Sequence, residues 1–323
     1  MAVKSTFALC TLFGLGIAVP EPRSLDPVRT VFQFPPDTFF ENLAVRSNGE
    51  ILTSLLNEPQ LFAVLVHEFT DSLGFAGIAE YEPDIFAVIS GRFNIPTGDV
   101  GPGSWNGNVL SGSPNVSLIA NVASANFLNG ITLLSQSEGT FLLSDINAGV
   151  VYRLDTQGSY EVVINRTLTN SVPTPPVPLT GVDGLHVHHD GDLKTLYFVN
   201  AGQGFLASVA INDDGTPAGD IEIVARPLEP VDTYDDFTFD CDGNIFLVTG
   251  SGNGSMIAGN VNSTAIAEPT SAAFGRGLND KNVLYVSTAG GMEVPVDGNI
   301  TIGAQLVAVT TSSQGSAACA LYL

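Results

Sequence analysis

The stretch from Asn129 to Asn165 constrains the fold of this chain more than any other. It contains four short apolar runs, ITLL, TFLL, VVYRL and YEVVI, which are separated by the turn signals SEG, INAG and TQG. Short β-type runs divided by Gly-containing turns are typical of a four-stranded antiparallel meander. A single meander cannot bury both of its faces, but copies of it packed around an axis share a core. The stretch therefore predicts one blade of a β-propeller.

Similar patterns recur along the chain. Three further clear copies begin at Glu41, Asp183 and Asp235. Two weaker copies begin at Phe75, where Pro83-Asp84 replaces the Gly turn, and at Ser271. The Gly turns of the clear copies are Asn48-Gly49, Glu138-Gly139, Asp190-Gly191 and Asp242-Gly243. Six copies predict an all-β, six-bladed propeller, and their unequal spacing places the insertions in loops.

The run VRTVFQF, between Asp26 and Phe40, has no neighbouring strand in the sequence with which to pair. The last copy, at residues 271–311, supplies only three good strands. A propeller that donates its N-terminal strand to the last blade leaves no free edge. We therefore expect residues 28–34 to form the outer strand of the last blade, within a single domain that covers residues 19–323.

The first 18 residues have the features of a secretory signal peptide. One Lys precedes the apolar run FALCTLFGLGIAV, and Pro-rich polar sequence follows it. The run is too short to span a bilayer comfortably, because about 20 apolar residues are needed. We expect cleavage after Ala18 and export through the secretory pathway to the extracellular space, with a membrane anchor as the less favoured alternative.

Acidic residues greatly outnumber basic ones, and the formal net charge is −22. Such a surface repels phosphate backbones and anionic lipid headgroups. We expect neither nucleic acid nor a membrane as a partner, and we assign most of the acid to solubility. The sequence leaves the oligomeric state open.

Two sets of residues fit an oxidising, glycosylating route. Cys10 would leave with the signal peptide, so Cys241 and Cys319 remain as an even pair, and we expect a disulfide between them rather than two free thiols. Five sequons could accept glycans, although some sequons occur by chance: Asn115, Asn165, Asn253, Asn262 and Asn299.

Two insertions interrupt the blade pattern. Residues 92–115 are rich in Gly, Pro and Asn and contain the only Trp, Trp105, so we interpret them as a loop. That loop is either a lid with a binding role or an inert surface excursion. The sequence NSVPTPPVPLTG, from Asn170, predicts a stiff extended connection into the fourth blade.

Four polar residues occupy the same place in four blades, at the junction that enters the inner strand: Glu41, Asn129, Asp183 and Asp235. Inner strands surround the axis, so equivalent junctions should converge at one mouth of the central channel. Carboxylate and amide oxygens suit a hard cation, Ca²⁺ above all. The alternative is that Asp and Asn cap tight turns before strands.

The blade openings FFENLAVRSNG, FLNGITLL, GVDGLHVHHDG and YDDFTFDCDGN resemble the SMP-30/gluconolactonase/LRE-like family of six-bladed propellers. In that family a Glu, two Asn and an Asp bind a divalent cation, and the Asp acts as base in lactone hydrolysis. The resemblance assigns these metal-binding roles to Glu41, Asn129, Asp183 and Asp235, and catalytic roles to the three acids among them. The sequence departs from the family at Glu41-Asn42-Leu43, at Asp183 in place of Asn, and at Asp235-Asp236.

The signal peptide, ENLAVRSNG, LNG, and DGLHV followed by LYFVN resemble a secreted fungal branch, the hetero-Diels-Alderases of tropolonic sesquiterpenoid biosynthesis. The resemblance implies a cyclase of secondary metabolism that takes small-molecule substrates. Water is lost from a hydroxymethyl tropolone to give an o-quinone methide, which then adds to an alkene of a humulene-type terpene. We expect no required cofactor, with Ca²⁺ or another divalent cation as the alternative.

A cycloaddition gains most from holding two reactants together, and a hydrogen-bond donor would polarise the tropolone oxygen. Candidate substrate contacts besides Asn129 are Asn42, Trp105, Phe127, His186, Tyr234 and Phe274, although the aromatics equally fit an ordinary core. His186 and His188 share a strand face but lack a third ligand for zinc. A metal-dependent lactonase and a non-catalytic binding propeller remain alternative functions.

Overall fold

A computed structural model describes residues 25–315 except 59, 63–66, 69–71, 95–98, 112–114, 175–176, 227–233, 250–255 and 261. The described residues form β-strands and a single 3-10 turn, Thr264–Ile266. No helix in these residues is long and apolar enough to cross a membrane. The expected signal peptide and Cys10 lie outside the described residues.

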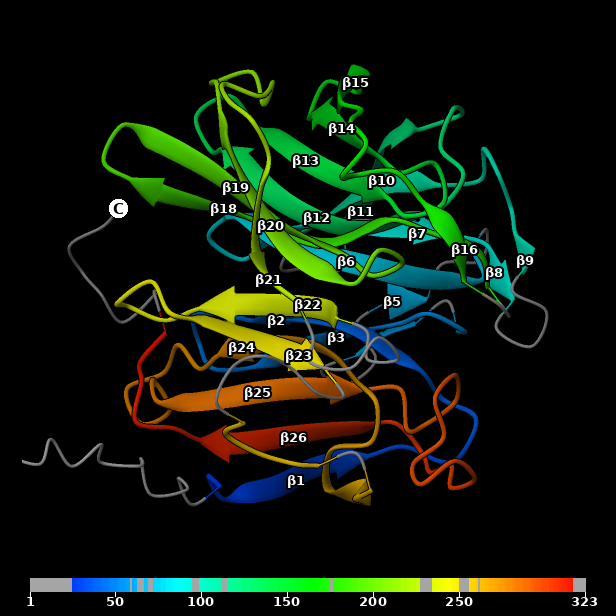
Figure 1. Ribbon diagram of the computed structural model, residues 1–323, viewed down its shortest axis with the longest axis vertical. Coiled ribbons are helices and arrows are strands. Elements are labelled where there is room, and N and C mark those ends of the chain that lie inside the picture. The colour runs from blue at the N-terminus through cyan, green and yellow to red at the C-terminus, as the bar shows by residue number, and fades with distance from the viewer. Residues whose placement is uncertain are drawn as a thin grey trace, which may run out of the picture.

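Consecutive segments of the chain form successive antiparallel sheets (Figure 1). The first sheet contains β2 (Phe40–Val45), β3 (Ile51–Leu55), β4 (Gln60–Phe62) and β5 (His67–Glu68). The second contains β6 (Gly74–Glu82), β7 (Ile85–Gly91), β10 (Asn106–Ser111) and β11 (Asn115–Asn121). The third contains β12 (Leu128–Ser135), β13 (Thr140–Asp145), β14 (Val150–Asp155) and β15 (Tyr160–Ile164), so the four strands predicted for residues 129–165 are confirmed.

The second half of the chain continues this arrangement. The fourth sheet contains β18 (Val182–Asp190), β19 (Leu193–Asn200), β20 (Phe205–Ile211) and β21 (Glu222–Ala225). A pair of described strands follows, β22 (Tyr234–Phe239) and β23 (Ile245–Thr249). The last sheet contains β24 (Pro269–Phe274), β25 (Val283–Thr288), β26 (Gln305–Thr310) and β1 (Val28–Gln33).

The first strand of each sheet lies nearest the axis. β2, β6, β12, β18, β22 and β24 contact one another in this order, and β24 contacts β2. The inner strands therefore form a closed ring, with the later strands of each sheet successively farther out. This is the architecture of an all-β propeller.

The expected closure by the N-terminal strand is confirmed. β1 pairs antiparallel with β26, with Val28 opposite Val309 and Gln33 opposite Gln305. Figure 1 shows the blue β1 beside the red β26 at the lower edge of the molecule. The two ends of the described chain are thereby joined in one sheet, which covers the outer edge of β26.

The predicted turns adopt the backbone conformation that their residues favour. Gly49, Gly139, Gly191 and Gly243 all have positive φ angles, from 59° to 86°. Asp84 takes the equivalent place in the second sheet with φ 65°. Asp and Asn tolerate this left-handed region better than other residues with a Cβ, which explains why Pro83-Asp84 can replace a Gly turn.

Two expectations about the insertions were wrong. Residues 92–115 are not one loop: they contain the short pair β8 (Phe93–Asn94) and β9 (Asp99–Val100), and then β10, the third strand of the second sheet. The Pro-rich segment from Asn170 does not run straight, because β16 (Val172–Thr174) pairs with β17 (Val177–Thr180) as a hairpin. In both places Gly and Pro residues, which are typical of loops, lie within or beside short strands, and the local sequence does not show with which strands these pair.

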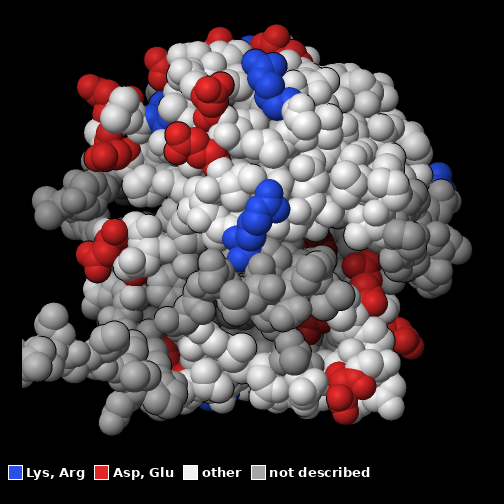
Figure 2. Space-filling model, in the orientation of Figure 1, with Lys and Arg blue, Asp and Glu red and all other residues white. Residues whose placement is uncertain are grey.

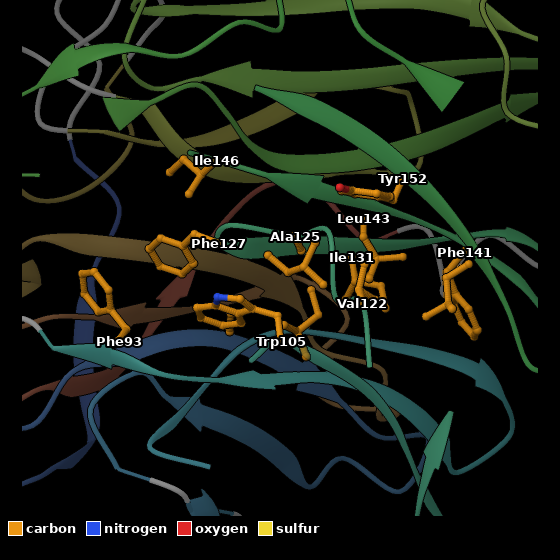
Figure 3. Close-up of a cluster of buried hydrophobic side chains, with 14 of the residues drawn as sticks. Phe93, Trp105, Val122, Ala125, Phe127, Ile131, Phe141, Leu143, Ile146 and Tyr152 are labelled. Atoms are coloured by element: carbon orange, nitrogen blue, oxygen red, sulfur yellow. The ribbon is translucent and has the colours of Figure 1, made fainter. Parts of the chain in front are cut away.

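Trp105 lies in the largest cluster of buried apolar side chains, between the second and third sheets. Its ring stacks on Phe127 with a centroid distance of 4.7 Å, and Phe93 stacks on the same Phe127 at 4.8 Å (Figure 3). The indole N–H donates to the carbonyl of Asn126 at 2.9 Å. A β-carbon added to Gly91 would stand 2.2 Å from the Trp105 ring, so the close fit of the indole depends on this glycine. Trp105 is therefore a core residue and not part of a lid.

Acidic side chains are scattered over the face shown in Figure 2, and basic side chains are few. This distribution agrees with the assignment of most of the negative charge to solubility.

Candidate active site at the propeller axis

Each of the six inner strands has a β-bulge at the same place in the hairpin that it forms with the next strand. The register shifts lie between Phe40 and Asn42, Phe75 and Ile78, Leu128 and Ile131, Val182 and Leu185, Tyr234 and Phe237, and Pro269 and Ser271. A bulge re-aims the side chain of the extra residue and bends its strand. The four residues predicted from the blade junctions, Glu41, Asn129, Asp183 and Asp235, all lie inside these bulges. They therefore occupy equivalent positions in the ring.

The position that follows the junction carries glycine in one half of the ring and a polar side chain in the other half. In the second, third and fourth sheets it is a glycine, and an added β-carbon would stand 2.6–2.7 Å from a backbone oxygen in the next bulge. The pairs are Gly77 with Asn129, Gly130 with Asp183, and Gly184 with Asp235. Real β-carbons do not approach an oxygen so closely, and glycine therefore allows the successive inner strands to come together here.

In the other half of the ring the same position carries polar side chains, Asn42, Asp236 and Ser271. Asn42 Nδ2 donates to Asp236 Oδ2 at 3.2 Å, and Ser271 Oγ donates to the same oxygen at 2.8 Å. His186 Nε2 lies 3.0 Å from Asp236 Oδ1. The structure thus brings two predicted site residues, Asn42 and His186, onto one carboxylate. The sequence analysis missed Asp236 because it selected Asp235, the preceding residue. A comparison of the position after each junction would have identified Asp236.

Burial makes the acids of the ring hard to ionise. Desolvation raises the pKa of Glu41 to about 8; a hydrogen bond from Asn129 Nδ2 to Glu41 Oε1, at 2.8 Å, opposes the rise, and the charge of Glu293 adds to it. Burial also raises the pKa of Asp183 and of Asp235 well above their ordinary values. The charge of Glu41 raises both further. Near neutral pH Glu41 is therefore mainly a neutral carboxyl that can donate a hydrogen bond.

Two further acids approach the ring from outside the inner-strand bulges, and sequence reasoning missed both. Glu268 has φ 55° and accepts hydrogen bonds from the backbone N–H groups of Glu293, at 3.2 Å, and Val294, at 2.8 Å. The Glu293 side chain keeps contact with solvent, yet desolvation raises its pKa to about 7, and the charge of Glu268 contributes. Glu293 lies in the β25–β26 connection, which has no counterpart in the blade pattern, so that pattern contained no signal for it.

The predicted aromatic contacts are buried. The exposed fraction is 1% for Trp105 and Tyr234, 4% for Phe127 and 6% for Phe274. These values favour the core alternative for all four side chains.

The ring fits a cation in the type of its donors but not in their arrangement. Its oxygens are of the hard type that Ca²⁺ prefers, and Asp183 Oδ1 is buried without a hydrogen-bond partner. In the described part of the chain, however, no group of three or more His, Cys, Asp or Glu is placed to hold a metal ion. Asn129 also directs its amide nitrogen at Glu41. We derive no chemical step through a metal.

The disulfide and the glycans stay predictions. The backbone N–H of Cys241 donates to the carbonyl of Gln314 at 2.8 Å, so the end of the described chain runs beside Cys241. Cys319 lies outside the described residues. Asn165, Asn262 and Asn299 are exposed, Asn115 begins β11, and Asn253 is not described.

The closed ring of inner strands makes this protein a β-propeller, and the bulges of that ring place a group of polar side chains at its axis. Solved structures similar to this chain include a luciferin-regenerating enzyme, with a TM-score of 0.60 and 16% identity over 90% of this chain and 97% of the other. Regucalcin, a calcium-binding protein from Agrobacterium tumefaciens, has a TM-score of 0.60 and 14% identity over the same shares. The expected resemblance to SMP-30/gluconolactonase/LRE-like propellers is thus confirmed in the fold, although no family model matches the chain.

Two curated proteins are more similar in sequence. One, from Phoma sp., is named "Putative hetero-Diels-Alderase" and is 25% identical over 81% of this chain and 86% of its own length. Another, from Sarocladium schorii, is named "Putative hetero-Diels-Alderase asR5" and is 25% identical over 85% of this chain and 80% of its own length.

Proposed function

We propose that this protein is a hetero-Diels-Alderase that joins a tropolone o-quinone methide to a humulene-type sesquiterpene. Both curated relatives are named as putative hetero-Diels-Alderases, and the similarity covers most of their length. We also propose that the propeller has six blades, with β22 and β23 as the inner half of the fifth.

The observation that carries the proposal is the buried carboxyl of Glu41 on the ring of bulges, where burial raises its pKa and favours the form that donates a hydrogen bond. An o-quinone methide reacts as an electron-poor heterodiene whose oxygen gains charge as the new bonds form. A hydrogen bond to that oxygen lowers the barrier, and a donor fixed in a desolvated site is more effective than water. Glu41 is 5% exposed and its Oε1 accepts a hydrogen bond from Asn129, so its carboxyl is held in place.

Orientation of the two reactants is the second source of the rate enhancement. A bimolecular addition held in a reactive geometry can gain roughly 7–11 kcal/mol from prepaid translational and rotational entropy. The reaction forms one C–O and one C–C bond and breaks only π-bonds, so it needs no nucleophile on the protein. The absence of a nucleophile-elbow motif of the G-x-S-x-G type in the sequence is consistent with this chemistry.

The test is a paired assay of the purified protein. A hydroxymethyl tropolone and a humulene-type alkene are incubated with and without protein, and the adduct is quantified and resolved by chiral chromatography. The proposal predicts faster formation of a single stereoisomer. Equal rates and a racemic adduct in both reactions would contradict it.

A lactonase is the second candidate, and the orphaned Oδ1 of buried Asp183 favours it because a cation would satisfy that atom. The same preparation is therefore assayed with an aldonolactone in the presence and absence of Ca²⁺. Calcium-dependent lactone opening without adduct formation would replace the first candidate with the second.

A further inference from the structure

Asp236 is the most connected side chain at the axis. Its carboxylate, 4% exposed, accepts hydrogen bonds from Asn42 Nδ2 and Ser271 Oγ, and from the backbone N–H of Phe237 at 2.8 Å. These donors come from three sheets, and His186 comes from a fourth. A buried carboxylate with several donors is held in one orientation.

His186 combines a fixed ring with access to solvent. The edge of its imidazole meets Phe237 with a centroid distance of 4.9 Å and an interplanar angle of 82°, and 34% of the side chain is exposed. In the tautomer with the proton on Nε2, the imidazole donates to Asp236 Oδ1 across the 3.0 Å contact. Nδ1 then holds the free lone pair. A carboxylate that orients an imidazole in this way makes the other nitrogen a base and stabilises the imidazolium once it forms.

We propose that His186 is a catalytic base of the dehydration that produces the quinone methide, and that Asp236 is its positioning residue. The inference rests on the proposed function, for which the dehydration supplies the heterodiene. Asn42 follows Glu41 directly in β2 and also binds Asp236. The proposed hydrogen-bond donor therefore directly precedes, in β2, a residue that binds the positioning carboxylate.

The step balances without a further reagent. Nδ1 of His186 takes the proton of the tropolone hydroxyl, and the imidazolium passes that proton to the oxygen of the neighbouring hydroxymethyl group. The exocyclic C–O bond breaks with its electron pair and water leaves. The electron pair of the broken O–H bond forms the carbonyl C=O, and the displaced ring π-electrons form the exocyclic C=C of the quinone methide. The imidazole returns to its starting state.

His188 is a natural control. It lies two residues along β18 from His186, and its ring packs against Phe239 at 5.0 Å and Tyr197 at 6.4 Å. His188 therefore lies on the same strand as His186 and also packs against aromatic rings. The contact with the Asp236 carboxylate is made by His186.

The experiment isolates dehydration by omitting the terpene. Reversible loss and return of water exchanges the hydroxymethyl oxygen with H₂¹⁸O, and mass spectrometry measures the exchange. We expect His186→Gln to lower the exchange rate by about tenfold or more and His188→Gln to leave it within about twofold. Added imidazole should restore part of the exchange in His186→Ala, which a merely unfolded variant would not show. Exchange by His186→Gln at the wild-type rate would overturn the proposal.

A second reaction separates this inference from the proposed function. The quinone methide is generated chemically in the presence of the alkene, so that no dehydration is needed. His186→Gln should then still yield the stereochemically defined adduct. Loss of the adduct together with unchanged exchange would assign His186 to the cycloaddition and overturn the dehydration role. If the wild type forms no adduct from the generated quinone methide, the proposed function fails, while the exchange rates still decide the role of His186.

Discussion

The side-chain amide of Asn42 donates to the carboxylate of Asp236 across 3.2 Å, although 194 positions separate the two residues in the sequence. The contact links the first and fifth segments of the propeller and passes beside Ser271 of the last sheet. On the opposite side of the ring, glycines occupy the equivalent positions and the backbones approach closely. The axis therefore has one tightly packed half and one polar half, and the polar half contains the carboxylate network.

The tightly packed half predicts a strong effect of Gly184→Ala. The new β-carbon would stand 2.5 Å from Asp236 Oδ1 and 2.7 Å from the carbonyl oxygen of Asp235. Overpacking of this kind costs about 1–3 kcal/mol of the free energy of unfolding, and it should also displace Asp236. Gly219→Ala is the matched control, because no atom lies within 4 Å of its added β-carbon. Thermal midpoints measured side by side should fall for the first variant only; equal midpoints would show that the ring can relax.

The buried acids predict that stability decreases with rising pH. The folded-state pKa of Glu41, about 8, lies above its ordinary 4.5, so the native state binds the proton more tightly than the unfolded chain. Its contribution to stability is complete below pH 4.5 and is lost as the pH rises through 8. Asp183, Asp235 and Glu293 shift in the same direction. The thermal midpoint should fall between about pH 5 and pH 8, and less steeply in Glu41→Gln. A midpoint that rises over this range would contradict the assignment.

Removal of divalent metal should change turnover little. In the described residues no group of three or more His, Cys, Asp or Glu is arranged to hold a metal, and Glu41-Asn42 and Asp183 depart from the pattern that the resemblance implies. Adduct formation is measured before and after dialysis against EDTA. Complete loss of activity that Ca²⁺ restores would show that the ring rearranges around a cation.

A disulfide between Cys241 and Cys319 should be found by non-reducing peptide mapping of the native protein. The backbone N–H of Cys241 donates to the carbonyl of Gln314, so the described chain ends beside Cys241. In a chain-entropy model a loop of this size stabilises the folded state by on the order of 4 kcal/mol, so Cys319→Ala should lower the thermal midpoint. Recovery of both residues as free thiols in the native protein would rule the bond out.

Local patterns in the sequence predicted the repeating frame. The four runs between Asn129 and Asn165 became β12 to β15, and the turns at Gly49, Gly139, Gly191 and Gly243 took positive φ angles. Alternating strands and Gly turns are short-range features, so they can be recognised without knowledge of the neighbouring blade.

Contacts between blades were harder to predict because they depend on three-dimensional packing. Trp105 stands in a Gly-rich and Pro-rich stretch, and only its packing against Phe127, which directly precedes β12, shows that its ring belongs in the core. Similarly, Asp235 and Asp236 are chemically alike in the sequence. The bulge places the second of them, and not the first, beside Asn42, Ser271 and His186.

The last sheet contributes acids that no comparison of blades could reveal. Glu268 binds the backbone of Glu293 and Val294 through a turn with positive φ, and this contact brings the β25–β26 connection to the axis. Such an arrangement depends on the path of one long loop, for which the sequence contains no second copy.

The most direct test of the account measures turnover and thermal midpoint on the same preparations of wild type, Glu41→Gln and Asp235→Asn. Both substitutions keep the shape of the side chain and replace a carboxyl, whose O–H is a strong hydrogen-bond donor, by an amide, whose N–H is a weaker one. The account predicts that adduct formation falls by about tenfold or more, equivalent to roughly 1.4 kcal/mol of barrier, while the thermal midpoint at about pH 6 does not fall. Unchanged turnover per folded molecule in both variants would contradict it and place the active centre away from these bulges.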